Sequence, residues 1–162
     1  MKNFLIFLIS FFLIYFIISC NANKKRDCKQ LIAKTWEFQS MEFNRQKLLE
    51  NSEKIFFKKL KESELDEGVA FLKKMWEEKK AKDGSLMAFD EKGKILDNNL
   101  NEVAEYKLTL DCEKIIIKYP GISINGNRGK DNFDTGIIKV LTNEKLILES
   151  NVGITTIYKS KK

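Results

Sequence analysis

The chain contains no histidine, a single proline and no glycine before Gly68. Without an imidazole side chain, no histidine-based zinc site and no Ser-His-Asp or Cys-His catalytic arrangement can form. Nucleophilic catalysis would also need a general base beside a serine, cysteine or lysine, and no residue pattern marks such a pair. These absences predict that the protein is not an enzyme, and they favour binding or interaction as its class of function.

The aromatic residues are unevenly distributed, because five of the twelve phenylalanines lie in the first sixteen residues. There Lys2 precedes an almost entirely apolar run from Phe4 to Ile18. As a helix this run would span ~22 Å, which is shorter than the ~30 Å hydrocarbon core of a bilayer. The segment is therefore interpreted as the hydrophobic part of an export signal, the alternative being an uncleaved membrane anchor.

The apolar run ends in the tetrapeptide Ile-Ile-Ser-Cys at residues 17–20. This ending resembles the lipobox of bacterial lipoproteins. The resemblance implies that residues 1–19 are a signal peptide, that cleavage falls between Ser19 and Cys20, and that Cys20 carries a covalent lipid. No other cofactor is expected. Because Asn21 stands where an aspartate commonly signals inner-membrane retention, the resemblance implies a lipid-anchored protein of the cell envelope. We expect the outer membrane, with the domain facing the periplasm or the surface.

Residues 20–30 are predicted to form the lipidated tether, which makes the membrane the first expected partner. The basic triplet 24–26 could touch anionic head groups or simply be solvated linker. Once Lys2 leaves with the signal, 28 basic residues remain against 23 acidic ones, a net charge of +5. The two signs are interleaved along the chain, as in Glu77 to Lys80, so a nucleic-acid partner is not expected.

The mature domain begins with a strand pattern over residues 33–43. Trp36 and Phe38 share one face of this strand, whereas Met41 has the opposite parity. The change of parity predicts a β-bulge near Ser40 that bends the strand.

Residues 45–82 change to a helical period, which predicts a helical insertion over an open end or one face of the sheet. The apolar residues that recur at this spacing are Leu48, Leu49, Ile55, Phe56, Leu60, Val69, Leu72, Met75 and Trp76.

Beyond Gly84 the period of two returns, with short turns between the segments. Strands are predicted at residues 85–89, 94–96, 103–110, 115–119, 135–141, 146–149 and 154–159. In the third of these, the side chains expected to point inward are Ala104, Tyr106, Leu108 and Leu110. Such a succession favours a mainly β, antiparallel up-and-down barrel of about eight strands. The alternative is an α+β domain with helices packed on a sheet.

Three segments resemble the bacterial lipocalin-like lipoproteins. They are the opening Lys-Thr-Trp-Glu-Phe at residues 34–38, the hairpin Phe-Asp-Glu-Lys-Gly at 89–93, and the closing pattern at 137–159. The resemblance implies a lipocalin-like domain over residues 31–162, interrupted by the insertion 45–82. The chain departs from the pattern at Lys34, where the family has a glycine.

The resemblance also implies a role for the opening tryptophan. In the family this residue packs at the closed end of the barrel beneath a base from the last strand. Trp36 matches the tryptophan, and Lys159 or Lys161 matches the base. The candidate residues of the barrel interior are Trp36, Phe38, Tyr106, Leu108 and Tyr158, with Tyr119 and Phe133 also available.

Two cysteines remain after Cys20 is acylated, and an exported protein can join them. A Cys28–Cys112 disulfide would close a long loop and tie the tether to the barrel, the alternative being two unrelated thiols. No metal site is predicted. Asp97-x-Asn99-x-Asn101 opens like a calcium loop, but it lacks the glycine and the glutamate that such a loop needs.

Two functions remain from these observations. The first is a binding module whose small barrel holds an apolar molecule. The second is an interaction, inhibitor or envelope-assembly lipoprotein that contacts another envelope protein through the insertion, with Trp76 as the residue of interest. An apolar cavity inside the barrel would favour the first, and an exposed apolar patch on the helices would favour the second.

Overall fold

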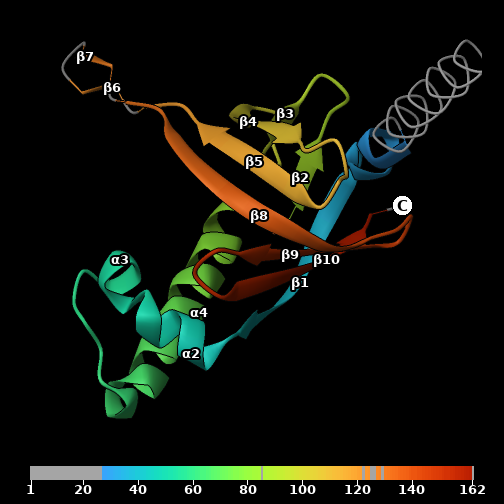
Figure 1. Ribbon diagram of the computed structural model, residues 1–162. Coiled ribbons are helices and arrows are strands. Elements are labelled where there is room, and N and C mark those ends of the chain that lie inside the picture. The colour runs from blue at the N-terminus through green and yellow to red at the C-terminus, as the bar shows by residue number, and fades with distance from the viewer. Residues whose placement is uncertain (1–26, 85, 122, 125–126, 129, 162) are drawn as a thin grey trace, which may run out of the picture.

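The computed structural model describes residues 27–84, 86–121, 123–124, 127–128 and 130–161. Eight of the described strands close into a barrel in the order β1-β10-β9-β8-β5-β4-β3-β2 (Figure 1). Each strand of the barrel pairs antiparallel with its neighbours, and β10 returns to β1. The fold is therefore the predicted up-and-down, lipocalin-like barrel rather than helices on an open sheet.

The strand bounds lie close to those predicted from the alternation of side chains. The barrel strands are β1 Thr35–Phe43, β2 Leu86–Phe89, β3 Lys94–Leu96, β4 Glu102–Leu108, β5 Lys114–Tyr119, β8 Asn132–Leu141, β9 Lys145–Ser150 and β10 Ile154–Ser160. The pair β6 Ser123–Ile124 and β7 Asn127–Arg128 forms a separate small sheet in the connection between β5 and β8.

The first strand carries the predicted bulge. Phe38 pairs with Tyr158 and Ser40 with Ile157, so Gln39 is the extra residue. Trp36 and Phe38 point into the barrel before the bulge, and Met41 packs against the same core after it. The bulge thus lets one strand present both parities to one interior.

The helical insertion comprises α2 Arg45–Glu50, α3 Ser52–Phe56, the 3-10 turn η1 Glu62–Glu64 and α4 Leu65–Asp83. It has a small core of its own, in which Leu48, Leu60 and Leu65 are buried. Ser52 is also buried there, and its hydroxyl donates to the carbonyl of Leu49 at 2.8 Å and accepts from the N–H of Leu60 at 3.0 Å. The insertion is thus held partly by contacts within itself.

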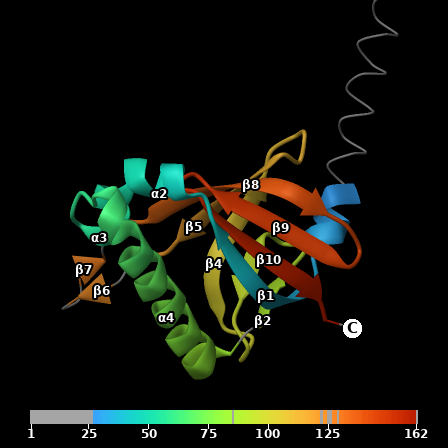
Figure 2. The ribbon, with the colours of Figure 1, turned by 90° about the horizontal axis from the view of Figure 1, so that it is seen from below.

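The two ends of the barrel are covered by different segments. Residues 27–32 are helical and precede β1, so they lie at the end of the barrel where β1 begins. The insertion follows β1 and lies at the other end, and Figures 1 and 2 both place α4 beside the barrel there. We call the end beside residues 27–32 the anchor-side end, because the predicted tether leads into it. We call the end beside the insertion the mouth.

Glu149 of β9 ties the insertion to the barrel wall. Its carboxylate, which is nearly buried, accepts from Lys139 Nζ at 2.7 Å and from Lys47 Nζ at 2.6 Å. Lys139 sits in a second bulge, in β8, whereas Lys47 belongs to α2. The hydrogen bonds from Lys139 and Lys47 hold the pKa of Glu149 below its ordinary value.

Replacing this carboxylate should produce a pH-dependent loss of stability. We expect Glu149→Gln to lower the free energy of unfolding at neutral pH by on the order of 1 kcal/mol. Because the folded-state pKa lies below the unfolded one, the contribution is complete above the unfolded pKa and is lost as the pH falls through the folded pKa. Urea unfolding of parent and variant from neutral pH to about pH 3 should show their difference shrinking. Glu144→Gln, at an exposed turn, is the control. If the difference in unfolding free energy between parent and Glu149→Gln did not change with pH, the lowered pKa of Glu149 would be wrong.

Candidate functional site

The residues of the predicted lipid attachment, Ser19 and Cys20, lie outside the described residues, as does the rest of the export signal. Within the described part of the chain, no helix combines the length and the apolar character needed to cross a bilayer.

The structure joins Cys28 to Cys112, with 6.3 Å between the two Cα atoms. Cys28 belongs to the helical residues 27–32, which reach into the stretch assigned to the tether. Cys112 lies in the turn between β4 and β5, and its backbone has a positive φ of 61°. The predicted disulfide is therefore present, and it fastens the helix to the anchor-side end of the barrel.

Trp36 closes this end from inside. Its side chain is 0% exposed, and its indole N–H donates to the carbonyl of Ile32 at 2.9 Å. Across the sheet Trp36 lies opposite Ser160 of β10. Ile32, which the sequence did not single out, is itself fully buried, so the helix and the first strand pack into one unit.

The other interior candidates meet in the same core. The cluster contains Trp36, Phe38, Tyr106, Leu108 and Tyr158, together with Ile32, Phe89, Ile95, Ala104, Ile115, Leu146 and Leu148. The ring of Tyr106 stands edge-on to that of Phe89 at 5.1 Å, and its hydroxyl donates to the carbonyl of Asp90 at 2.7 Å. Burial raises the pKa of Tyr106 to about 12, so the hydroxyl remains a donor at any physiological pH.

Three expected interior residues lie outside the core. Leu110 is 65% exposed, because β4 ends at Leu108 and the chain has already entered the turn to β5. Phe133 is 68% exposed and Tyr119 is 43% exposed, at the ends of β8 and β5 nearest the mouth. Alternation predicts the face of a residue, but not where the neighbouring strands stop covering it.

An aromatic cluster fills the mouth of the barrel. The ring of Trp76, from α4, lies 4.8 Å from that of Phe38 in a tilted arrangement. Phe38 in turn meets Tyr158 edge-on at 6.1 Å, and Lys80 Nζ lies 5.9 Å from the centre of the Phe38 ring. Burial raises the pKa of Tyr158 well above its usual range. The mouth is therefore an apolar aromatic surface, covered by one helix and bordered by a cation.

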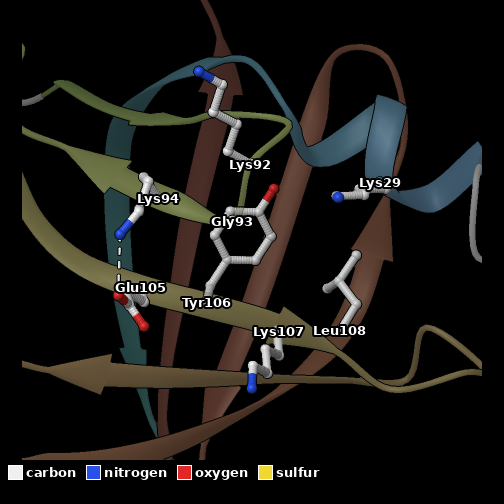
Figure 3. Close-up of a pocket in the computed structure, with 8 residues that line it drawn as sticks. All are labelled: Lys29, Lys92, Gly93, Lys94, Glu105, Tyr106, Lys107 and Leu108. Carbon is white, nitrogen blue, oxygen red and sulfur yellow. Dashed lines mark hydrogen bonds and ion pairs between the residues drawn. The ribbon is translucent and has the colours of Figure 1, made fainter.

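A pocket of about 430 Å³ opens at the anchor-side end (Figure 3). It lies between the helical residues 27–32, the turn from β2 to β3, and the last part of β4. Figure 3 shows the Tyr106 ring at its centre, with Lys29 reaching toward that ring and Lys94 turned to Glu105. The full lining is Lys29, Lys92, Gly93, Lys94, Glu105, Tyr106, Lys107 and Leu108. Five of the eight residues that line this pocket are charged, whereas the mouth is filled by aromatic side chains with one lysine beside them.

No group of three or more histidine, cysteine, aspartate or glutamate side chains among the described residues is placed to hold a metal ion. In the segment that begins like a calcium loop, Asp97 accepts from the backbone N–H groups of Asn99 and Asn101, each at 2.8 Å. These bonds form a local turn in which the carboxylate already has donors.

The sequence matches no protein-family model and no curated protein. Among solved structures it is similar to a lipocalin-like protein from Bacteroides thetaiotaomicron, with 27% sequence identity and a TM-score of 0.35. The match covers 49% of this chain and 83% of that one. The fold itself follows from the strand order of this chain, which closes as an eight-stranded antiparallel barrel of the lipocalin-like type.

Proposed function

We propose that the protein is a lipid-anchored envelope protein whose barrel binds an apolar molecule at the mouth. No catalytic role is proposed. The observation that carries the binding proposal is the contact of Trp76 with Phe38, whose ring centres are 4.8 Å apart. An apolar ligand of similar size could take the place of the Trp76 ring against Phe38 and Tyr158, with α4 moving aside.

The position of α4 supports this route of entry. Its Trp76 packs against the barrel core, whereas Phe71 and Met75 on the same helix are 54% and 52% exposed. The helix therefore touches the barrel with one aromatic side chain, flanked by Lys73 near Phe43 and by Lys80 near Phe38. A cover held by few contacts opens at low cost in free energy.

Removing the ring that covers the mouth should strengthen ligand binding. An aromatic pair contributes about 0.5–1.5 kcal/mol, so we expect Trp76→Ala to bind an uncharged fluorescent naphthylamine probe about 2- to 12-fold more tightly than the parent. The exposed neighbour Phe71→Ala is the matched control and should leave the affinity unchanged. If parent and both variants all failed to bind the probe, the proposal of an apolar ligand would be wrong. As an independent measurement, native mass spectrometry of the protein purified from the envelope identifies any lipid that it carries.

The anchoring proposal rests on the tetrapeptide at residues 17–20 and has its own test. Cys20→Ser should abolish acylation and cleavage of the signal, because the lipid is attached to the cysteine thiol. Intact mass and membrane fractionation of parent and variant measure both effects. Cys28→Ser is the control, since it removes a cysteine outside the tetrapeptide and breaks only the disulfide to Cys112, so the protein should still carry lipid. A Cys20→Ser protein that still carried lipid would refute the lipobox interpretation.

A second function is supported by the same helix. Phe71 and Met75 lie one helical turn apart and are both more than half exposed, as a contact surface for an envelope partner would require. Replacing both by serine should then abolish recovery of a crosslinked partner from the envelope and leave binding of the naphthylamine probe unchanged. Trp76→Ala should instead strengthen binding of the probe and leave recovery of the crosslinked partner unchanged. The two variants therefore separate the two functions.

A further inference from the structure

We propose that the pocket at the anchor-side end binds the phosphate head group of an anionic phospholipid in the membrane that holds the protein. This inference rests on the proposed lipid anchor for its geometry, since the anchor places this end of the barrel next to a bilayer.

The charge of the lining favours an anion. Four lysines and one glutamate line the pocket. Lys94 is compensated, because its Nζ lies 2.7 Å from Glu102 and 3.0 Å from Glu105. The other three, Lys29, Lys92 and Lys107, are exposed, and none of them takes part in an ion pair within the described part of the chain. Figure 3 shows the Lys29 amine extending toward the Tyr106 ring, whereas the amines of Lys92 and Lys107 extend away from it at the rim. A phosphate entering the pocket would therefore meet Lys29 first, with Lys92 and Lys107 adding positive charge around the opening.

The backbone of β4 adds a donor. The N–H of Thr109 donates to the carbonyl of Lys114 in β5. Successive N–H groups along a strand point alternately to its two neighbours, so the N–H of Leu108 points toward the β3 side of β4. On that side the N–H of Tyr106 donates to the carbonyl of Gly93 at 2.7 Å. The pairing of β3 with β4 covers only residues 94–96 and 102–105, so no residue of β3 lies opposite Leu108. Its N–H therefore has no partner in β3, and Leu108 itself lines the pocket.

The disulfide holds one wall of the pocket in place. Lys29 follows Cys28 directly, and Cys28 is bonded to Cys112 in the turn after β4. Figure 3 shows the Lys29 amine extending from this wall toward Tyr106. The crosslink fixes the backbone from which Lys29 extends, so only the side chain of Lys29 has to become ordered when an anion binds.

The length of the tether places the pocket near the membrane. Only residues 21–26 separate Cys20 from the helical residues 27–32. At the 3.3–3.6 Å per residue of an extended chain, the seven steps from Cys20 to Asp27 reach about 25 Å at most. The anchor-side end must therefore stay within that distance of the bilayer, and exposed Leu110 is also at this end. Anionic head groups are thus the nearest abundant source of phosphate.

Chemical footprinting of the acylated mature protein in vesicles tests the proposal. Amine labelling of Lys29 is measured by mass spectrometry in vesicles with phosphatidylglycerol and in vesicles of phosphatidylcholine alone. We expect labelling of Lys29 about five-fold slower with phosphatidylglycerol, the factor for one lysine at an anionic surface. Lys59, on the insertion, should be labelled equally in both. Adding soluble glycerol phosphate to the phosphatidylcholine vesicles distinguishes a free phosphate from a head group.

Two matched variants sharpen the result. Lys92→Gln with Lys107→Gln should reduce the protection of Lys29, whereas Lys54→Gln with Lys59→Gln removes the same charge from the insertion and should not. Equal labelling in both kinds of vesicle would overturn the proposal, as would protection by glycerol phosphate alone or equal protection of Lys59. If the intact mass shows no lipid on Cys20, the result contradicts the proposed lipid anchor and not the proposed head-group pocket. The pocket is then tested by adding the unacylated protein to the same vesicles.

Discussion

Trp36→Ala should lower the free energy of unfolding by about 3–5 kcal/mol, the typical effect of removing a buried aromatic side chain. The side chain is fully buried at the anchor-side end of the barrel, so its removal leaves a cavity. The variant also loses the hydrogen bond from the indole to the carbonyl of Ile32, which joins β1 to the helical residues 27–32. The total free energy of unfolding of a domain is about 5–15 kcal/mol, so this single substitution should remove a large share of it.

Urea unfolding of the protein, followed by circular dichroism, measures this loss. Trp76→Ala is the matched comparison, because it removes the same side chain from a partly exposed position on α4. We expect the smaller loss there. A Trp36→Ala protein as stable as the parent would contradict the packing of the anchor-side end. Equal large losses at both positions would mean that α4 belongs to the main core.

Removal of the disulfide should have a comparable effect. Cys28 and Cys112 are 84 residues apart, and closing a loop of that length restricts the unfolded chain by about 4.5 kcal/mol in the loop-entropy treatment. We expect the Cys28→Ser, Cys112→Ser double variant to lose stability of this order, with the helical residues 27–32 less firmly held.

Non-reducing peptide mapping of the protein should first show the two cysteines joined. Unfolding of the parent is then measured with and without reductant. The double variant under the same conditions is the control, because reductant should not change its stability. Free thiols at both positions of the parent, or no effect of the double substitution, would contradict this account.

The alternation of side chains predicted most of the barrel, because each strand has one face in a single core. The inward placement of Tyr106 and Leu108 and the bulge near Ser40 are both confirmed. Leu110 shows the limit of this reasoning. It has the inward parity, yet the N–H of Thr109 donates to the carbonyl of Lys114 across the turn that contains Leu110, so Leu110 lies outside the sheet.

The candidate sites were less accessible to sequence reasoning. The lipid attachment was predicted from adjacent residues, because a processing signal is read along the chain. The pocket is different. It combines Lys29 with the turn at Lys92 and with Lys107, which lie far apart in the sequence and carry no shared pattern.

The sequence by itself determined the period and parity of the strands, the extent of the insertion and the pair of cysteines able to crosslink. These features depend on local spacing and composition, which the order of residues contains directly. The tertiary structure decided which elements cover each end of the barrel, that Trp76 rests on Phe38, and that lysines from three segments border one pocket. Those contacts depend on how the barrel closes, since closure brings distant residues together at distances that no local pattern encodes.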